Sequence, residues 1–207
     1  SSIVSQNLVS NLETLTNLLE TTQPSYIIES ACAAFATVFS SSKDDLTNWY
    51  ELAYSKLIRI LQSKQGSNYK RLQGRIVECI TIMGRAVGRE VFAKSAPEVI
   101  QVIIQLHQGD ITSADELTGY LLSAWQRICE LLCEDFSPYL SSVVPKLLSL
   151  AQPQEAQSLL VENAPVSSTQ TENIELSITT LQSFAECTSF GEYVDDTVRV
   201  SLPLLEY

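Results

Sequence analysis

Two long stretches of this chain repeat one pattern of apolar residues, and this repeat limits the possible folds more than any other feature of the sequence. Residues 71–108 read RLQGRIVECITIMGRAVGREVFAKSAPEVIQVIIQLHQ, and residues 116–152 read ELTGYLLSAWQRICELLCEDFSPYLSSVVPKLLSLAQ. In each segment, a first stretch with helical spacing of apolar residues is followed by a phenylalanine, and a second helical stretch begins at that residue. These residues, Phe92 and Phe136, are 44 positions apart. The repeating unit is therefore a pair of helices.

A two-helix unit repeated at this spacing is typical of HEAT-type solenoids, in which no unit buries its apolar face alone. We predict an all-α fold, an armadillo-like α-solenoid of about four to five HEAT-type helical hairpins, with residues 1–207 as a single array. The composition, 45% hydrophobic and 18% charged, is sufficient for a continuous core. Solenoids serve mostly as binding surfaces, so the repeat favours a binding protein over an enzyme.

Apolar spacing and helix-breaking residues predict where the helices lie. Residues 153–171 have no sustained period, so we expect an inserted loop there. GDITSAD is an expected loop with Ser113 as the candidate N-cap of the helix that follows it, from about residue 115, and Pro145 is an expected kink inside a helix. The start without Met and the end in mid-pattern at LPLLEY indicate a piece of a longer array. The predicted helices cover residues 3–21, 24–39, 46–62, 69–87, 90–108, 115–132, 137–151, 172–189 and 191–207.

The charge of the chain is unevenly distributed. Residues 1–94 hold 10 Lys and Arg against 8 Asp and Glu, a net charge of +2, whereas residues 95–207 hold 3 against 16, a net charge of −13. This asymmetry argues against a nucleic-acid-binding protein and for a basic partner of the second half. The alternative is that the acidic charge serves only the solubility of a long surface. No run of about 18 apolar residues is present, so we expect no membrane insertion.

Two segments carry a resemblance to a known family. At KRLQGRIVECITIMGRAVGREVF, residues 70–92, and at LLSAWQRICELLCEDFSPYLSSVVPKLLSLA, residues 121–151, the sequence resembles the beta-karyopherin (importin-beta) family, and within it the importin beta-3 branch. A weaker likeness includes VRVSLPLLEY, residues 198–207, and the whole covers most of the chain from about Tyr50 onward. These motifs are specific in combination, and none would suffice singly.

The resemblance implies a nuclear transport receptor that shuttles between cytoplasm and nucleus. The concave face of its repeats would bind lysine-rich protein cargo for Ran-regulated nuclear import. The implied partners are cargo with a basic localisation signal and, through the full-length receptor, the Ran GTPase and nucleoporins, with no nucleic acid. Members of the family usually carry longer acidic inserts near GDITSAD and near residues 153–171. These segments are short in this chain, so we do not expect such inserts to contribute to cargo binding here. The alternative is a HEAT-repeat scaffold subunit of the phosphatase-regulatory type, without Ran control.

The concave helices are expected at residues 24–39, 69–87, 115–132 and 172–189. A helical projection places Leu121 and Ile128 on the core side and Trp125 at the edge of the exposed face. A carboxylate beside an exposed aromatic ring suits a lysine ammonium, which predicts a cargo-binding strip. The alternative is that these are ordinary solvated positions and that Trp125 is a partly buried packing residue. The predicted strip consists of Glu78, Thr81, Trp125, Gln126, Glu130, Ser183 and Glu186.

The remaining candidate residues favour structural roles. His107 is the single histidine, and its position at a helix end predicts capping or surface exposure. Cys129 and Cys133 are four positions apart, but without a second pair they do not predict a zinc site. Gly84 and Gly88 are expected to allow close packing or to end a helix. The sequence holds no phosphate loop or nucleophile elbow, so we expect no enzyme activity, no cofactor and no metal.

Overall fold

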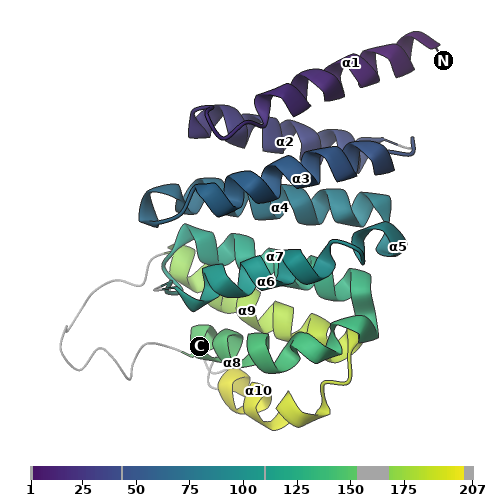
Figure 1. Cartoon of the computed structure of the whole chain (residues 1–207). Helices are drawn as coiled ribbons and strands as arrows, with labels where there is room; N and C mark the ends of the chain where they lie inside the picture. Colours follow the sequence, from purple (N-terminus) through teal and green to yellow (C-terminus); the bar gives the residue numbers. More distant parts are fainter. Residues whose placement is uncertain (1, 43, 110, 153–167, 203–207) are drawn as a thin grey trace. The chain divides into compact units, whose positions relative to one another are not determined.

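The chain folds into helical hairpins, as its repeat predicts. The computed structural model describes residues 2–42, 44–109, 111–152 and 168–202, and every regular element in this part of the chain is a helix (Figure 1). The contacts divide the chain into two compact units, unit 1 (Ser1–Val99) and unit 2 (Ile100–Tyr207). The predicted all-α hairpin fold is confirmed, whereas the single continuous array over residues 1–207 stays a prediction.

Unit 1 contains two helical hairpins arranged in two layers. Helix α2 packs along α4 in one layer, α1 contacts α3 in the other, and each hairpin joins the two layers (Figure 1). Ile28, Phe35 and Phe39 of α2 recur at helical spacing and therefore share one face of the helix. This face points inward, and all three side chains are almost completely buried. The elements are α1 (Ser2–Leu18), α2 (Ser25–Ser41), α3 (Thr47–Ser63), the short 3-10 helix η1 (Ser67–Tyr69), α4 (Lys70–Val87) and α5 (Arg89–Phe92).

Two glycines shape the end of α4. An added Cβ at Gly84 would lie 2.3 Å from Cδ2 of the buried Phe92, so the absence of a side chain lets the phenylalanine pack against the helix. Gly88 has a φ of 87°, a left-handed conformation that glycine adopts easily, and the helix ends there. The expected roles of both glycines are confirmed.

The predicted helix over residues 90–108 is wrong as a single element, because the structure divides it into α5 and α6 (Ala96–Gln108). The Ser95 hydroxyl donates to the Phe92 carbonyl at 3.0 Å, which stabilises the turn between the two helices. Pro97 has no amide hydrogen with which to continue the helical bonding across this turn.

Unit 2 repeats the two-layer arrangement. Helix α7 packs along α9, and α8 contacts both α9 and α10. An aromatic cluster fills the centre: the Phe136 ring lies 6.0 Å from Trp125 and 5.1 Å from Phe184, centroid to centroid. The elements after α6 are α7 (Glu116–Leu132), the 3-10 helix η2 (Cys133–Tyr139), α8 (Leu140–Ala151), α9 (Ser168–Cys187), the 3-10 helix η4 (Gly191–Tyr193) and α10 (Val194–Ser201).

Asn173 of α9 connects this helix to the loop before α7. Its buried side-chain amide donates to the carbonyls of Ser113 at 2.8 Å and Asp115 at 3.1 Å. The predicted N-cap Ser113 is wrong, because Asp115 occupies that position. Ser113 is instead buried beneath the start of α9, where its carbonyl serves as the acceptor for Asn173.

Three further predictions concern the segments around α8. Pro145 lies inside α8, as expected, but the helix predicted from residue 137 begins only at Leu140, after the 3-10 segment that contains Pro138. The expected loop over residues 153–171 is wrong at its end, since residues 168–171 form the first turn of α9. Its other residues, 153–167, lie outside the described part, as do residues 203–207 with Pro203.

Candidate functional site

Two glutamine–glutamate pairs lie on the polar faces of α7 and α9. On α7, the side-chain amide of Gln126 donates to Oε1 of Glu130 at 3.1 Å. On α9, the amide of Gln182 donates to Oε1 of Glu186 at 2.9 Å. The partners in each pair are four residues apart, which places them one turn apart on the same helical face. Each amide therefore orients a carboxylate at the surface.

The packing of α7 on α9 places these two pairs on neighbouring helices. The Thr180 hydroxyl donates to the Leu122 carbonyl at 3.4 Å, and Sγ of Cys129 lies 4.0 Å from the Ser183 carbonyl. Burial is the largest cause that raises the pKa of the Cys187 thiol, and the negative charges of Glu130 and Glu186 raise it further. The two carboxylates therefore share one neighbourhood at the C-terminal ends of α7 and α9, which we call the acidic pair face, formed by Gln126, Glu130, Gln182 and Glu186.

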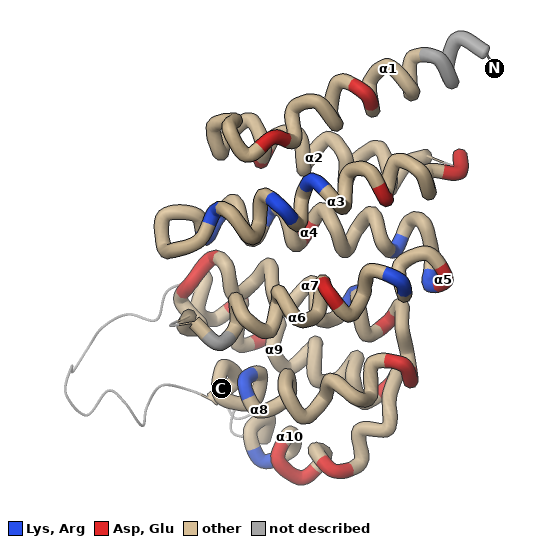
Figure 2. The backbone as a smooth tube through the Cα atoms, viewed as in Figure 1, with Lys and Arg blue, Asp and Glu red and all other residues tan. Residues whose placement is uncertain are grey.

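The acidic pair face belongs to the strongly acidic half of the chain. In the described part of unit 2, Figure 2 shows acidic positions spread over several helices and few basic ones, in agreement with the net charge of −13 over residues 95–207. Oriented carboxylates in such a field can accept hydrogen bonds from an ammonium group, and bonds of this kind are stronger than those between neutral groups. The arrangement suits a lysine-rich segment.

Three residues of the predicted strip are buried and do not lie on the exposed face that the strip requires. Trp125 is 0% exposed, Thr81 2% and Ser183 8%, so their predicted exposure is wrong. The Thr81 hydroxyl donates back to the Val77 carbonyl at 3.0 Å within its own helix. The physical reason is that these helices are packed on more than one side. A projection with a single buried face therefore assigns too many positions to solvent.

Glu78 lies in unit 1, as the buried Thr81 does. Its side chain is 30% exposed and accepts a hydrogen bond from Arg75 at 3.0 Å, within an ion pair one turn long. Gln126, Glu130 and Glu186 are the predicted residues that unit 2 brings together. As an exposed surface within one unit, the predicted strip therefore holds only for Gln126, Glu130 and Glu186.

Gln182 was missed by the sequence reasoning, although a signal for it exists. Gln126 and Glu130 form a Gln-x-x-x-Glu motif that recurs at Gln182 and Glu186, 56 positions later. A comparison of the two helices in register would have found it. Glu134 was also missed; its Oε2 accepts hydrogen bonds from Ser137 at 3.0 Å and Ser189 at 3.1 Å. Glu134 thereby links the start of η2 to the segment that follows α9.

His107 is buried, with 4% of its surface exposed, so the predicted surface or capping role is wrong. The Trp125 indole N–H donates to its Nδ1 at 3.1 Å. Burial, together with the positive charge of Lys146, lowers the pKa of His107 to about 4. The ring is therefore neutral at physiological pH.

The cysteines are free thiols, and Cys32, Cys79 and Cys129 are buried. Cys133 follows the last residue of α7 and has a φ of 51°, so it does not continue the face of Cys129 in helical geometry. Within the described residues, no group of three or more His, Cys, Asp or Glu side chains is arranged to hold a metal ion. None of the described helices is both long enough and apolar enough to cross a membrane.

Comparison with known proteins gives the family. No protein-family model matches the chain. Importin subunit beta-3 of Saccharomyces cerevisiae is 34% identical over 150 residues, which is 72% of this chain and 14% of that protein. A crystal structure of Kap121p bound to RanGTP matches 95% of this chain and 20% of its own length, with a TM-score of 0.73 and 26% identity.

A second Kap121p structure, bound to the extreme C-terminus of the phosphatase Cdc14p, matches 100% of this chain and 21% of its own length, with a TM-score of 0.76 and 26% identity. The chain thus spans about one fifth or less of the length of these relatives. By sequence and by fold, the chain corresponds to a segment of HEAT repeats of the beta-karyopherin family.

Proposed function

We propose that this chain is part of a nuclear transport receptor and that its acidic pair face binds a lysine-rich segment of protein cargo. The observation that carries the proposal is the pair of amide-oriented carboxylates, Glu130 and Glu186, on adjacent helices. The relatives support the same function, since they are named importin and karyopherin and their structures include one with a phosphatase C-terminus bound. The chain would act by binding and not by catalysis.

The affinity of such a face comes from several modest contacts. An exposed ion pair contributes roughly 0.2–1 kcal/mol, so one lysine bound to one carboxylate is insufficient by itself. Two carboxylates on the neighbouring helices α7 and α9 suit an extended segment with more than one lysine. Because these contacts are exposed, salt is expected to weaken them.

Ran control, nucleoporin binding and shuttling between cytoplasm and nucleus belong to the same proposal. They are supported by the Kap121p structures bound to RanGTP and to Nup53p. A ligand shifts a binding equilibrium only by its differential affinity for two states, so RanGTP would have to favour a form of the receptor with weaker cargo affinity. A scaffold without Ran control is the alternative, and cargo affinity that does not change when RanGTP binds the receptor would favour it.

The test is calorimetric binding of a lysine-rich peptide at about 50 and 200 mM salt. We expect salt-sensitive binding that Glu130→Gln and Glu186→Gln each weaken severalfold, and their combination roughly tenfold or more. Both substitutions keep the shape of the side chain and remove its charge, with one acceptor oxygen replaced by an NH₂ group. Binding that is unaffected by the double substitution would exclude this face as the cargo site.

Asp195→Asn provides the matched control. Asp195 is an exposed acidic residue of the same unit, on α10, and its substitution changes the net charge by the same amount as either glutamate substitution. We expect it to leave the peptide affinity nearly unchanged. An equal loss of affinity for Asp195→Asn would mean that the peptide senses only the overall negative field and no specific face.

A further inference from the structure

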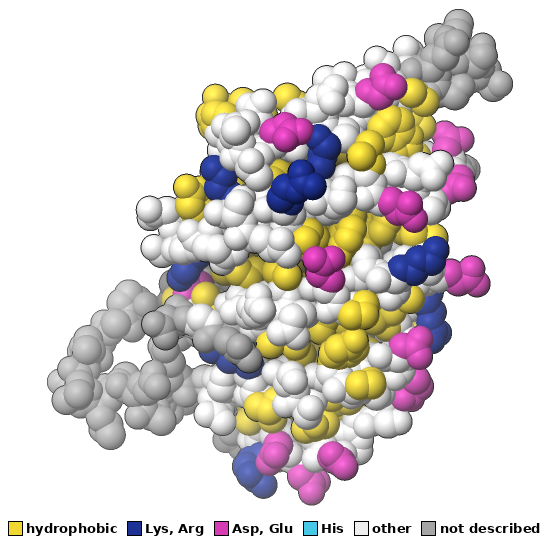
Figure 3. All heavy atoms as spheres, viewed as in Figure 1, with side chains coloured by type: hydrophobic (Ala, Val, Ile, Leu, Met, Phe, Trp, Pro, Cys, Tyr) yellow, Lys and Arg dark blue, Asp and Glu magenta, His cyan; other side chains and the backbone are white. Residues whose placement is uncertain are grey.

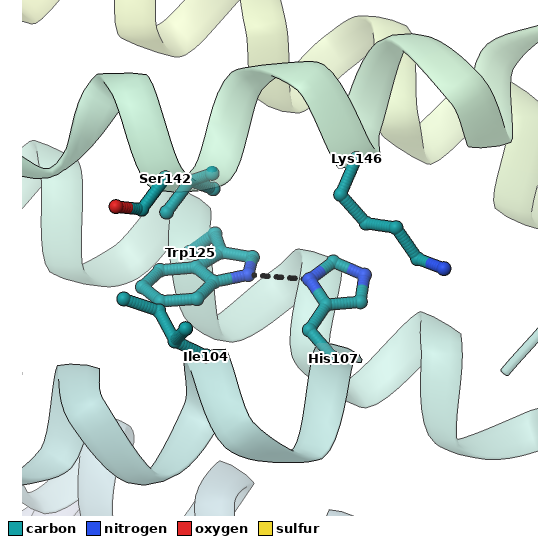
Figure 4. Close-up of a pocket in the computed structure, with 6 residues that line it drawn as sticks. Ile104, His107, Trp125, Ser142 and Lys146 are labelled. Atoms are coloured by element: carbon teal, nitrogen blue, oxygen red, sulfur yellow. Dashed lines mark hydrogen bonds between the residues drawn. The ribbon is translucent and has the colours of Figure 1, made fainter. Parts of the chain in front are cut away.

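A small pocket lies between α6, α7 and α8 of unit 2, apart from the acidic pair face. Its volume is about 210 Å³, and Figure 4 shows the side chains that surround it. The apolar wall is formed by Ile104, Val143 and the ring of Trp125, and the polar part by His107, Lys146 and Ser142. On the surface drawn in Figure 3, hydrophobic side chains are visible between α6 and α8.

The hydrogen bond from Trp125 determines where the proton of His107 lies. An indole N–H can only donate, so Nδ1 of His107, 3.1 Å away, must be the acceptor and carry no proton. In a neutral imidazole the proton is then on Nε2. The Nε2–H group is buried and has no hydrogen-bond partner among the described residues. His107, which lines the pocket, therefore holds a buried donor without an acceptor, on the ring edge that faces Lys146.

Lys146 supplies a second donor beside the first. Figure 4 shows its side chain extending toward the edge of the His107 ring that is opposite Trp125. Its Nζ donates to the Ile111 carbonyl at 3.4 Å, a long bond that uses one of its three hydrogens. Within the described residues it forms no ion pair, although residues 95–207 hold 16 acidic residues and only 3 basic ones.

A buried donor without a partner costs about 1–3 kcal/mol, and most such groups in native proteins are satisfied by protein or by water. Here the orphan N–H lies next to an ammonium group, and both border one small cavity. Two oxygens on a single anionic group would match the two donors. A carboxylate has this form, and its single negative charge would balance the single charge of Lys146.

We propose that this pocket binds a carboxylate between Nε2–H of His107 and Nζ of Lys146, with the short aliphatic chain of the ligand against Ile104, Val143 and Trp125. The volume suits an acid of a few carbon atoms or the end of a glutamate side chain. A phosphate dianion is a poorer match, since one ammonium and one neutral N–H leave its second charge and further oxygens without partners. The amide analogue of the acid is also a poorer match, because its NH₂ group would face a donor.

The test uses the single histidine as its own reporter. Titration with propionate, followed by long-range ¹H–¹⁵N NMR of the imidazole, should move the Nε2 resonance in a saturable way, and propionamide should not. Lys146→Gln should weaken the propionate affinity about tenfold or more, because it removes the charge-assisted bond. Arg199→Gln, which removes a positive charge from α10 in the same unit, should not. The folded state of each variant is checked by the Trp125 indole resonance.

The source of the carboxylate is distinguished by a second titration. A short peptide with one glutamate flanked by glycines is compared with free propionate and with its glutamine counterpart. Tighter binding of the glutamate peptide would indicate an acidic protein segment, and tighter binding of propionate would indicate a free small acid. The proposal is overturned if neither ligand shifts Nε2 saturably, or if the shift is the same in Lys146→Gln. The lysine-peptide experiment on the acidic pair face shares no substituted residue with this one, so the two proposals can fail separately.

Discussion

Single residues determine whether two helices of this chain can approach. Gly84 is the clearest case, since even one methyl group there would overlap the ring of Phe92. His107 is a second case, because one indole donor decides both its tautomer and its orientation. The sequence analysis singled out both residues, but only the packed structure shows which side chain each one contacts.

Gly84→Ala is expected to destabilise unit 1. The added Cβ would lie 2.3 Å from Cδ2 of Phe92, and overpacking of this kind costs about 1–3 kcal/mol. Chemical denaturation measures the loss. The double variant Gly84→Ala with Phe92→Leu should show less than the sum of the two single losses, because the smaller side chain relieves the clash. Strictly additive losses would contradict the contact.

His107 is expected to make the stability of the chain pH-dependent. Its pKa is lowered from 6.5 to about 4 in the folded chain, so between these values the unfolded chain binds a proton that the folded chain does not. The stability is therefore complete above pH 6.5 and falls as the pH is lowered toward 4, by about 3 kcal/mol in total.

Urea denaturation from pH 7.5 to 4.5 tests this, with His107→Gln as the comparison. Glutamine retains an acceptor for the Trp125 indole but does not titrate, so the variant should lose less stability over this range than the original chain. Since carboxylates contribute to both proteins, the difference between the two slopes is the quantity of interest. Equal slopes would contradict a buried, neutral His107.

At the scale of elements, contacts between helices distant in sequence hold the hairpins in register. Asn173 of α9 bonds two carbonyls of the loop before α7, about 60 residues away in the chain. One side chain thereby provides the hydrogen-bond donor for two backbone carbonyls, at Ser113 in the loop and at Asp115, the N-cap of α7. Such a contact cannot be read from local periodicity, since asparagine by itself suggests a turn or a cap.

Asn173→Ala is expected to destabilise unit 2 by about 2 kcal/mol, because two backbone carbonyls lose their donor. Hydrogen exchange should show the greatest loss of protection in the loop and in the first turn of α7. Asn48→Ala, at an exposed asparagine of α3, is the matched control and should change little. Equal effects of the two substitutions would show that the buried amide contributes nothing specific.

For the whole molecule, the distribution of charge limits the partners. The half with a net charge of −13 repels polyanions, but unit 1 holds Lys56 and Arg59 on α3 and Lys64 directly after it. Figure 2 and Figure 3 show basic positions along α3. Lys56 is paired with Glu20, which follows the end of α1, so part of this positive charge is balanced within the unit.

We expect no binding of a duplex DNA at physiological salt, whereas a lysine-rich peptide binds. Nucleic-acid affinity depends on neutralising several phosphates, and the basic residues of α3 are too few against the total charge of −11. Fluorescence anisotropy with a labelled duplex tests this at two salt concentrations. Salt-sensitive DNA binding that is lost in Arg59→Gln would contradict the expectation and assign a nucleic-acid site to α3.

The sequence by itself determined the helical class, the hairpin repeat and the family, because spacing, breakers and motifs are local properties that each segment carries alone. It also placed Gln126, Glu130 and Glu186 on the polar faces of their helices, in agreement with a simple helical projection. Only the tertiary structure decided that Trp125 and His107 are buried together, since burial depends on which other helices cover a face. In a layer where each helix is packed on several sides, the neighbours and not the period determine which side chains meet solvent.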